Sequence, residues 1–211
     1  TAYLKANFPV EFMAGLLGSE LGDIERVAVL VKECRQMGIA VLPPDINQSG
    51  QTFSVIVVEG RPAIRFGLAA VKNVGEGVVE GIVSERKNHG PFSSLEDLLL
   101  RLGLTHLNKK SLESLAKCGA LDSVGERAQL VGNIEKMLKF MRSSAGASAG
   151  ESNGQSSLLS VVDITPHVPV LHLDPIASER SETLLAWEKE LLGLYVSEHP
   201  LSAFRAHLEL V

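Results

Sequence analysis

The segment that decides the fold reads Val71-Lys72-Asn73-Val74-Gly75-Glu76-Gly77-Val78-Val79-Glu80-Gly81-Ile82. Its pattern predicts two helices joined by a tight turn, the first ending at Val74 and the second beginning near Val78. Gly75 and Gly77 are expected to adopt φ values that residues with a Cβ disfavour. The segment therefore fits a helix–hairpin–helix unit.

Such a unit offers a physical way to bind a phosphate. The first N–H groups of the second helix have no partner inside the helix and lie at the positive end of its dipole. A phosphate fits there without touching a base, so binding of this kind is independent of nucleotide sequence. The candidate contacts, including three nearby cations, are Lys72, Asn73, Gly75, Glu76, Gly77, Val78, Arg86 and Lys87.

A second, weaker copy of the pattern follows. Residues 107–115 are predicted to form a helix capped by Asn108, residues 117–121 a hairpin, and Asp122 or Ser123 the cap of the next helix. Residues 91–104 would form the connecting helix. The hairpin has one glycine instead of two, which makes phosphate binding less favourable. The candidate contacts in this copy are Lys109, Lys110, Lys117 and Gly119.

The charge is distributed unevenly along the chain. A net charge of −5 argues against a generally basic nucleic-acid binder. Residues 60–117, however, carry nine basic and six acidic side chains, while both flanks are acidic. A polyanion is therefore expected to bind the middle third of the chain, residues 60–117. With about two to four phosphate contacts, the affinity for DNA should be weak and should fall as salt rises.

A second interpretation remains open, in which the hairpins pack against protein and the chain is a helical interaction module without DNA contact. The exposure of the Gly75–Gly77 turn distinguishes the two. If the N–H groups of this turn face solvent beside Lys72, DNA binding is favoured. If they are buried, the protein-interaction module is favoured.

The rest of the sequence predicts a mainly α fold with a small β-hairpin. Pro9 should divide an N-terminal helical stretch in two, and Asp23 should cap a helix that ends near Gly38. Residues 53–58 and 63–66 read as the hairpin strands. Cys34 and Cys118 stand outside any metal-binding pattern and are expected to be buried, reduced thiols. No apolar run is long enough to predict a membrane span.

Several long blocks resemble the bacterial DNA polymerase III alpha subunits. The blocks are residues 1–14, 33–47, 65–77 and 187–195, and shorter matches stand at 90–92, 119–122 and 199–201. They occur in the family's order and spacing. The resemblance therefore covers nearly the whole chain and implies an internal segment of a replicative polymerase.

This resemblance implies a division into four parts. Residues 1–66 would be the C-terminal part of the fingers domain, and residues 67–142 a tandem helix–hairpin–helix domain that holds duplex DNA. Residues 143–170, rich in Ser, Ala and Gly at their start, would be a flexible linker. Residues 171–211 would begin the following domain.

The resemblance also implies partners. Gln155, Leu158 and Leu159 match the family's sliding-clamp-binding motif, with Leu159 in place of the usual aromatic residue. The expected partners are duplex primer–template DNA, the sliding clamp and other replicase subunits, in the cytoplasm and away from membranes. The catalytic palm aspartates and their Mg²⁺ would lie outside this segment, so no catalytic or metal-binding residue is expected here.

Overall fold

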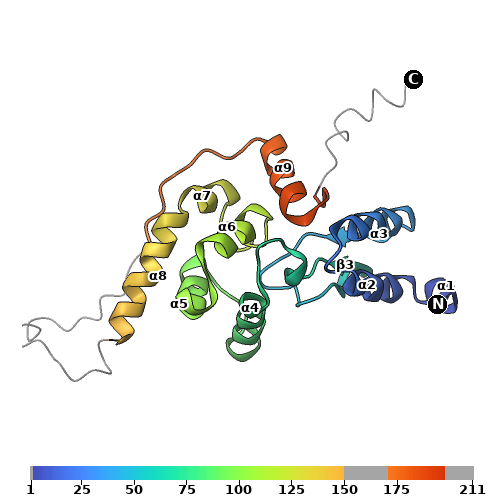
Figure 1. Ribbon diagram of the computed structural model, residues 1–211, viewed down its shortest axis with the longest axis horizontal. Helices are drawn as coiled ribbons and strands as arrows, with labels where there is room; N and C mark the ends of the chain where they lie inside the picture. Colours follow the sequence, from blue (N-terminus) through green and yellow to red (C-terminus); the bar gives the residue numbers. More distant parts are fainter. Residues whose placement is uncertain (1, 150–170, 198–211) are drawn as a thin grey trace, which may run out of the picture.

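The computed structural model describes residues 2–149 and 171–197. These residues are mainly helical with one small sheet, as the sequence predicted (Figure 1). The helices are α1 (Ala2–Asn7), α2 (Pro9–Ser19), α3 (Ile24–Gln36), α4 (Glu76–His89), α5 (Leu95–His106), α6 (Lys109–Lys117), α7 (Arg127–Gly132), α8 (Ile134–Ala149) and α9 (Ser181–Leu192), with a 3₁₀ turn η1 (Leu68–Ala70). The strands are β1 (Val41–Leu42), β2 (Ser54–Val58) and β3 (Arg61–Arg65).

The N-terminal helices follow their sequence signals. Pro9 occupies the first turn of α2 and separates it from α1, because proline starts a helix well but cannot continue one. The Asp23 carboxylate caps α3 by accepting a hydrogen bond from the Arg26 N–H at 3.0 Å. Gly38, just past the end of α3, has a φ of +74°. All three features confirm the sequence predictions.

The sheet contains the predicted hairpin and one further strand. β2 and β3 pair antiparallel through a turn in which Glu59 and Gly60 both have positive φ. β1 then pairs with β3 in parallel, with Val41 opposite Ile64, so the strand order is β1-β3-β2. The short apolar stretch before the Pro43–Pro44 break is thus a strand. With only two residues, β1 was too short to be predicted as a strand from the sequence.

Helix α8 extends further than its composition suggested. The predicted change from helical domain to flexible linker lies at residue 143, yet α8 continues to Ala149. The hydroxyls of Ser143 and Ser144 donate to the Phe140 carbonyl at 2.8 and 2.9 Å, inside the helix. Alanine is also the strongest helix former, so a Ser- and Ala-rich stretch propagates a helix that has already started.

The loop at residues 45–52 joins the N-terminal part to both hairpins. Ile46 and Ser49 are buried, so the backbone polar groups in that part of the loop need partners. The Ile46 N–H donates to the Ala120 carbonyl at 2.7 Å, and the Ser49 hydroxyl donates to the Phe66 carbonyl at 2.7 Å. A single apolar core surrounds this loop and includes residues from the N-terminal helices, the sheet and α4–α8.

Helix α9 packs against α6 and connects several parts of the molecule (Figure 1). The buried Glu188 carboxylate pairs with the Arg127 guanidinium at 3.3 Å and accepts the N–H groups of residues 196–197. The Lys72 N–H donates to the Leu191 carbonyl at 3.0 Å. The end of α9 is therefore tied both to α7 and to the turn before α4.

Both cysteines are expected to be unreactive in the folded protein. Cys34 and Cys118 are free and buried, and burial raises the pKa of Cys34 to about 11 and that of Cys118 to about 12. Because the thiolate is the reactive form, a thiol reagent at mildly alkaline pH should label neither residue before denaturation and both after it. Rapid labelling of the native chain, followed by mass spectrometry, would contradict this packing.

Candidate nucleic-acid interface

The turn before α4 differs in detail from its sequence prediction. The stretch expected to be the first helix contains only η1, and α4 begins at Glu76 instead of near Val78. Gly75 is the N-cap with a φ of −73°, so neither it nor Gly77 needs a left-handed conformation. Asn73 adopts that conformation instead, with a φ of 68°. The predicted role of the two glycines in forming a strained turn was wrong.

Asn73 fits this position for two reasons. Asparagine tolerates the left-handed region better than most residues that carry a Cβ. Its side-chain amide also donates to the Ser114 hydroxyl at 3.3 Å, which joins the turn to α6. Asn73 is therefore a structural residue of the turn, and its hydrogen bond connects the two hairpin units.

Gly75 and Gly77 leave the surface of the turn open. A Cβ built on either residue would meet no heavy atom within 4 Å, and residues 75–77 are all exposed. Neither backbone strain nor internal packing therefore requires glycine here. What glycine provides at such a position is close access to the backbone from outside the protein.

The N-terminus of α4 has no side-chain cap. Gly75 supplies no capping atom, and its carbonyl accepts the N–H groups of Val78 and Val79 at 3.0 and 3.2 Å. The N–H groups of Glu76 and Gly77 come earlier in the helix, where no carbonyl of the same helix reaches them. Together with the helix dipole, they make a positive contribution to the potential at this end of α4, which the Glu76 carboxylate in the first turn opposes.

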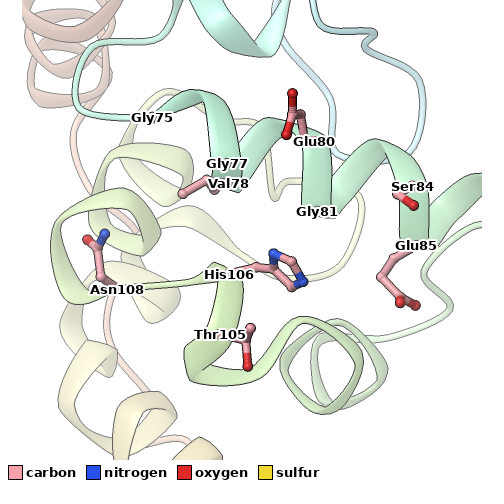
Figure 2. A pocket seen from close by; sticks show the side chains of 10 residues that line it. All are labelled: Gly75, Gly77, Val78, Glu80, Gly81, Ser84, Glu85, Thr105, His106 and Asn108. Carbon is pink, nitrogen blue, oxygen red and sulfur yellow. The ribbon is translucent and has the colours of Figure 1, made fainter.

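A hollow of about 580 Å³ runs along α4 from this N-terminus (Figure 2). One wall is α4 itself, and the other is the junction between α5 and α6. The residues that line the α4 wall are Gly75, Gly77, Val78, Glu80, Gly81, Ser84 and Glu85. The facing residues are Thr105, His106 and Asn108.

Thr105 and His106 were missed in the sequence analysis as site residues, and Asn108 was identified only as a cap. Gly103 has a φ of 51° and kinks α5 just before them. No local pattern marks Thr105 and His106, because they meet α4 only through the packing of α5. Gly81 offered the one signal of this contact. A glycine inside a helix costs stability, so its presence indicates that another part of the protein approaches the helix closely there.

The cations predicted for the first hairpin are not brought together. Lys72 is exposed beside the turn, whereas Lys87 is exposed near the opposite end of α4. Arg86 donates to the Ile46 and Ser49 carbonyls at 2.8 and 2.7 Å. Burial lowers the pKa of Arg86, and the charge of Asp45 partly offsets this effect. The Arg86 guanidinium thus holds the 45–52 loop and is not part of an open cationic surface.

The second hairpin begins as predicted. Asn108 caps α6, and a complete capping box forms with Ser111. The next helix, α7, begins later than expected, and Glu126 caps it in place of Asp122 or Ser123 by accepting the Gln129 N–H at 2.7 Å. Asp122 and Ser123 lie too early to cap α7, because the loop continues past them and the helix begins only at Arg127.

Two of the three lysines predicted as contacts in this second hairpin are paired within the protein. Lys117 pairs with Glu113, and Lys109 pairs with Glu135. Gly119 has a φ of 82°, and a Cβ there would meet the Arg127 guanidinium at 2.1 Å. Lys110 remains exposed at the start of α6. The two hairpins are thus unequal, since only the first presents an uncapped helix start next to an open surface.

Arg127 sits at the centre of this occupied region. Burial acts to lower the pKa of Arg127, but the hydrogen bonds and charges of Asp122 and Glu188 outweigh it and raise the pKa. A guanidinium that is already paired with two carboxylates has little capacity left for a phosphate. The predicted clamp motif at Gln155, Leu158 and Leu159 lies outside the described residues.

Comparison with known proteins agrees with this geometry. Residues 38–130 match the helix-hairpin-helix motif family. The chain is 44% identical over 201 residues to the DNA polymerase III subunit alpha of Thermus aquaticus, covering 95% of this chain and 15% of that protein. It is 39% identical over 210 residues to that of Chlamydia pneumoniae, and 40% identical over 207 residues to that of Campylobacter jejuni. These matches cover 99% and 97% of this chain but only 16% and 17% of those relatives.

Replacing Arg86 should destabilise the fold. Arg86→Gln removes the donors that reach two carbonyls of the interior loop, and we expect the free energy of unfolding to fall by about 1–3 kcal/mol. The neighbouring, exposed Lys87→Gln is the matched control, expected to change stability by less than about 0.5 kcal/mol. Urea unfolding measures both variants. Equal stability of the two would show that Arg86 does not hold the loop.

Proposed function

The chain is related over nearly its whole length to a segment of DNA polymerase III alpha subunits, and from this relation we propose that it holds duplex DNA by the sugar-phosphate backbone. The chain spans 15–17% of the length of the relatives compared. In this proposal the hairpin before α4 makes the contact. The binding is independent of base sequence, as a subunit that copies every template requires.

The observation that carries the proposal is the open N-terminus of α4. Glu76 and Gly77 offer N–H groups without intrahelical partners, and the empty space outside Gly75 and Gly77 lets a phosphate oxygen approach them. A contact to a phosphate fixes position but carries no base information. The exposure of this turn beside Lys72 is the feature that favours DNA over a purely protein-binding module.

The local charge is compatible with a modest DNA affinity. Lys72 flanks the turn, and Lys110 lies two residues after Asn108, which lines the hollow. The exposed Glu76 and Glu80 oppose a phosphate, and the chain as a whole carries −5. With about two to four phosphate contacts, affinity should fall with salt at a log–log slope of roughly −2 to −4.

Further functions belong to the intact protein. We propose that it is a DNA-directed DNA polymerase whose Mg²⁺ is held by carboxylates outside this segment. Within the described residues, no group of three His, Cys, Asp or Glu side chains lies close enough to hold a metal ion. We also propose that the intact protein docks the sliding clamp through Gln155, Leu158 and Leu159. It would contact other replicase subunits as well. Across residues 2–149 and 171–197, no helix is long and apolar enough to cross a membrane.

Gly77→Ala separates binding from folding. The added methyl group meets no protein atom, so the variant should be as stable as the wild type or more stable by about 0.5 kcal/mol. The same methyl group stands where the DNA backbone approaches, and we expect the affinity for duplex DNA to fall about threefold or more. Fluorescence anisotropy with a labelled duplex and a thermal melt measure the two effects.

Gly15→Ala is the matched control for this experiment. Gly15 is also an exposed helical glycine with open space outside it, but it lies in α2, away from the hairpin. It should gain similar stability and leave DNA affinity unchanged. Unchanged affinity of the Gly77→Ala variant, or an equal loss in both variants, would argue against the first hairpin as the contact.

A further inference from the structure

The imidazole of His106 is held in the hollow by a close approach to α4. A Cβ on Gly81 would lie 2.4 Å from the Nδ1 atom of His106 and 2.5 Å from its Cγ atom. No side chain larger than glycine fits at position 81 unless His106 moves. Glycine inside a helix costs about 0.5–1 kcal/mol relative to alanine, so this contact accounts for a locally unfavourable residue.

His106 also has polar capacity that the protein leaves unused. Within the described part of the chain, its ring forms no hydrogen bond and no ion pair. The residue is only partly exposed, yet it lines the hollow together with Asn108 (Figure 2). An imidazole carries at least one N–H donor in any protonation state, and a donor that faces a hollow is available to a ligand.

The carboxylates of Glu80 and Glu85, two residues that line the hollow, do not occupy the space beside His106. Figure 2 shows the Glu80 side chain directed away from His106 and the Glu85 side chain at the far end from Gly75. Glu85 is held there by an ion pair with Arg101 at 3.5 Å and a hydrogen bond with the His89 ring at 3.0 Å. Between His106 and Gly75 the lining residues Gly77, Val78 and Asn108 carry no charge, so Glu80 is the carboxylate that an anionic strand has to pass there.

We propose that His106 is a second DNA contact, a side chain that donates a hydrogen bond to the sugar-phosphate strand whose phosphate sits at the N-terminus of α4. The strand would lie in the hollow between α4 and the α5–α6 junction, held from both walls. Gly81 is then a positioning residue, because it allows the imidazole to stand in the hollow. This inference rests on the proposed function and extends it to a side chain on the opposite wall.

Two substitutions of His106 test the donor directly. His106→Phe keeps a ring against Gly81 but removes the N–H groups, and duplex affinity measured by anisotropy should fall about three- to tenfold. His106→Gln restores a donor and should bind within about twofold of the wild type. Gly77→Ala is measured beside them. If it weakens binding while His106→Phe does not, the first hairpin still holds DNA and His106 is only a packing residue.

A measurement on the unmodified chain guards against variants that fail to fold. Diethyl pyrocarbonate labels accessible imidazoles, and bound duplex should protect His106 from labelling. His89 is the internal control, because its side chain is 63% exposed and lies at the other end of α4. Protection of His106 alone supports the inference. Equal labelling of His106 with and without bound DNA overturns it, and an absence of any DNA binding overturns the proposed function as well.

Discussion

The structure depends on satisfying the backbone of one interior loop, residues 45–52. An unpaired buried N–H or C=O group costs about 1–3 kcal/mol, so the buried part of this loop, at Ile46 and Ser49, needs a partner for each group. Arg86 of α4 supplies donors to Ile46 and Ser49. The side chain of Asn47 exchanges two hydrogen bonds with the backbone of Phe92, at 2.8 and 3.0 Å. These partners come from segments far apart in sequence, so the loop fixes their relative positions.

This constraint bears on how an acidic chain would present the local anion site that we propose. Arg86 anchors α4 to the loop near the C-terminal end of the helix, and the N-terminal end stands at the surface without a side-chain cap. The second hairpin is not open in this way, because Arg127 is paired with Asp122 and with the buried Glu188 of α9. One hairpin therefore faces outward while the other holds the returning chain. Under the proposed function, the two hairpins therefore have different tasks.

The sequence predicted the elements better than it predicted the contacts. The Pro9 break, the Asp23 cap, the β2–β3 hairpin and the Asn108 cap depend on neighbouring residues, and all were confirmed. The role of Arg86 was not predictable, because its partners lie about 40 residues away in sequence. Charge alone suggested an exposed phosphate contact. His106 was missed for the same reason, since only the packing of α5 against Gly81 places it in the hollow.

The glycines of the first hairpin show the limit of reasoning from residue type. Both glycines were expected to adopt strained φ values, but the positive φ belongs to Asn73, which local sequence did not distinguish. The most direct test of the account is an NMR titration of the ¹⁵N-labelled chain with duplex DNA. We predict that the largest amide shifts occur at residues 75–78. Shifts confined to the second hairpin, at residues 118–127, or no shifts at all, would contradict the central claim.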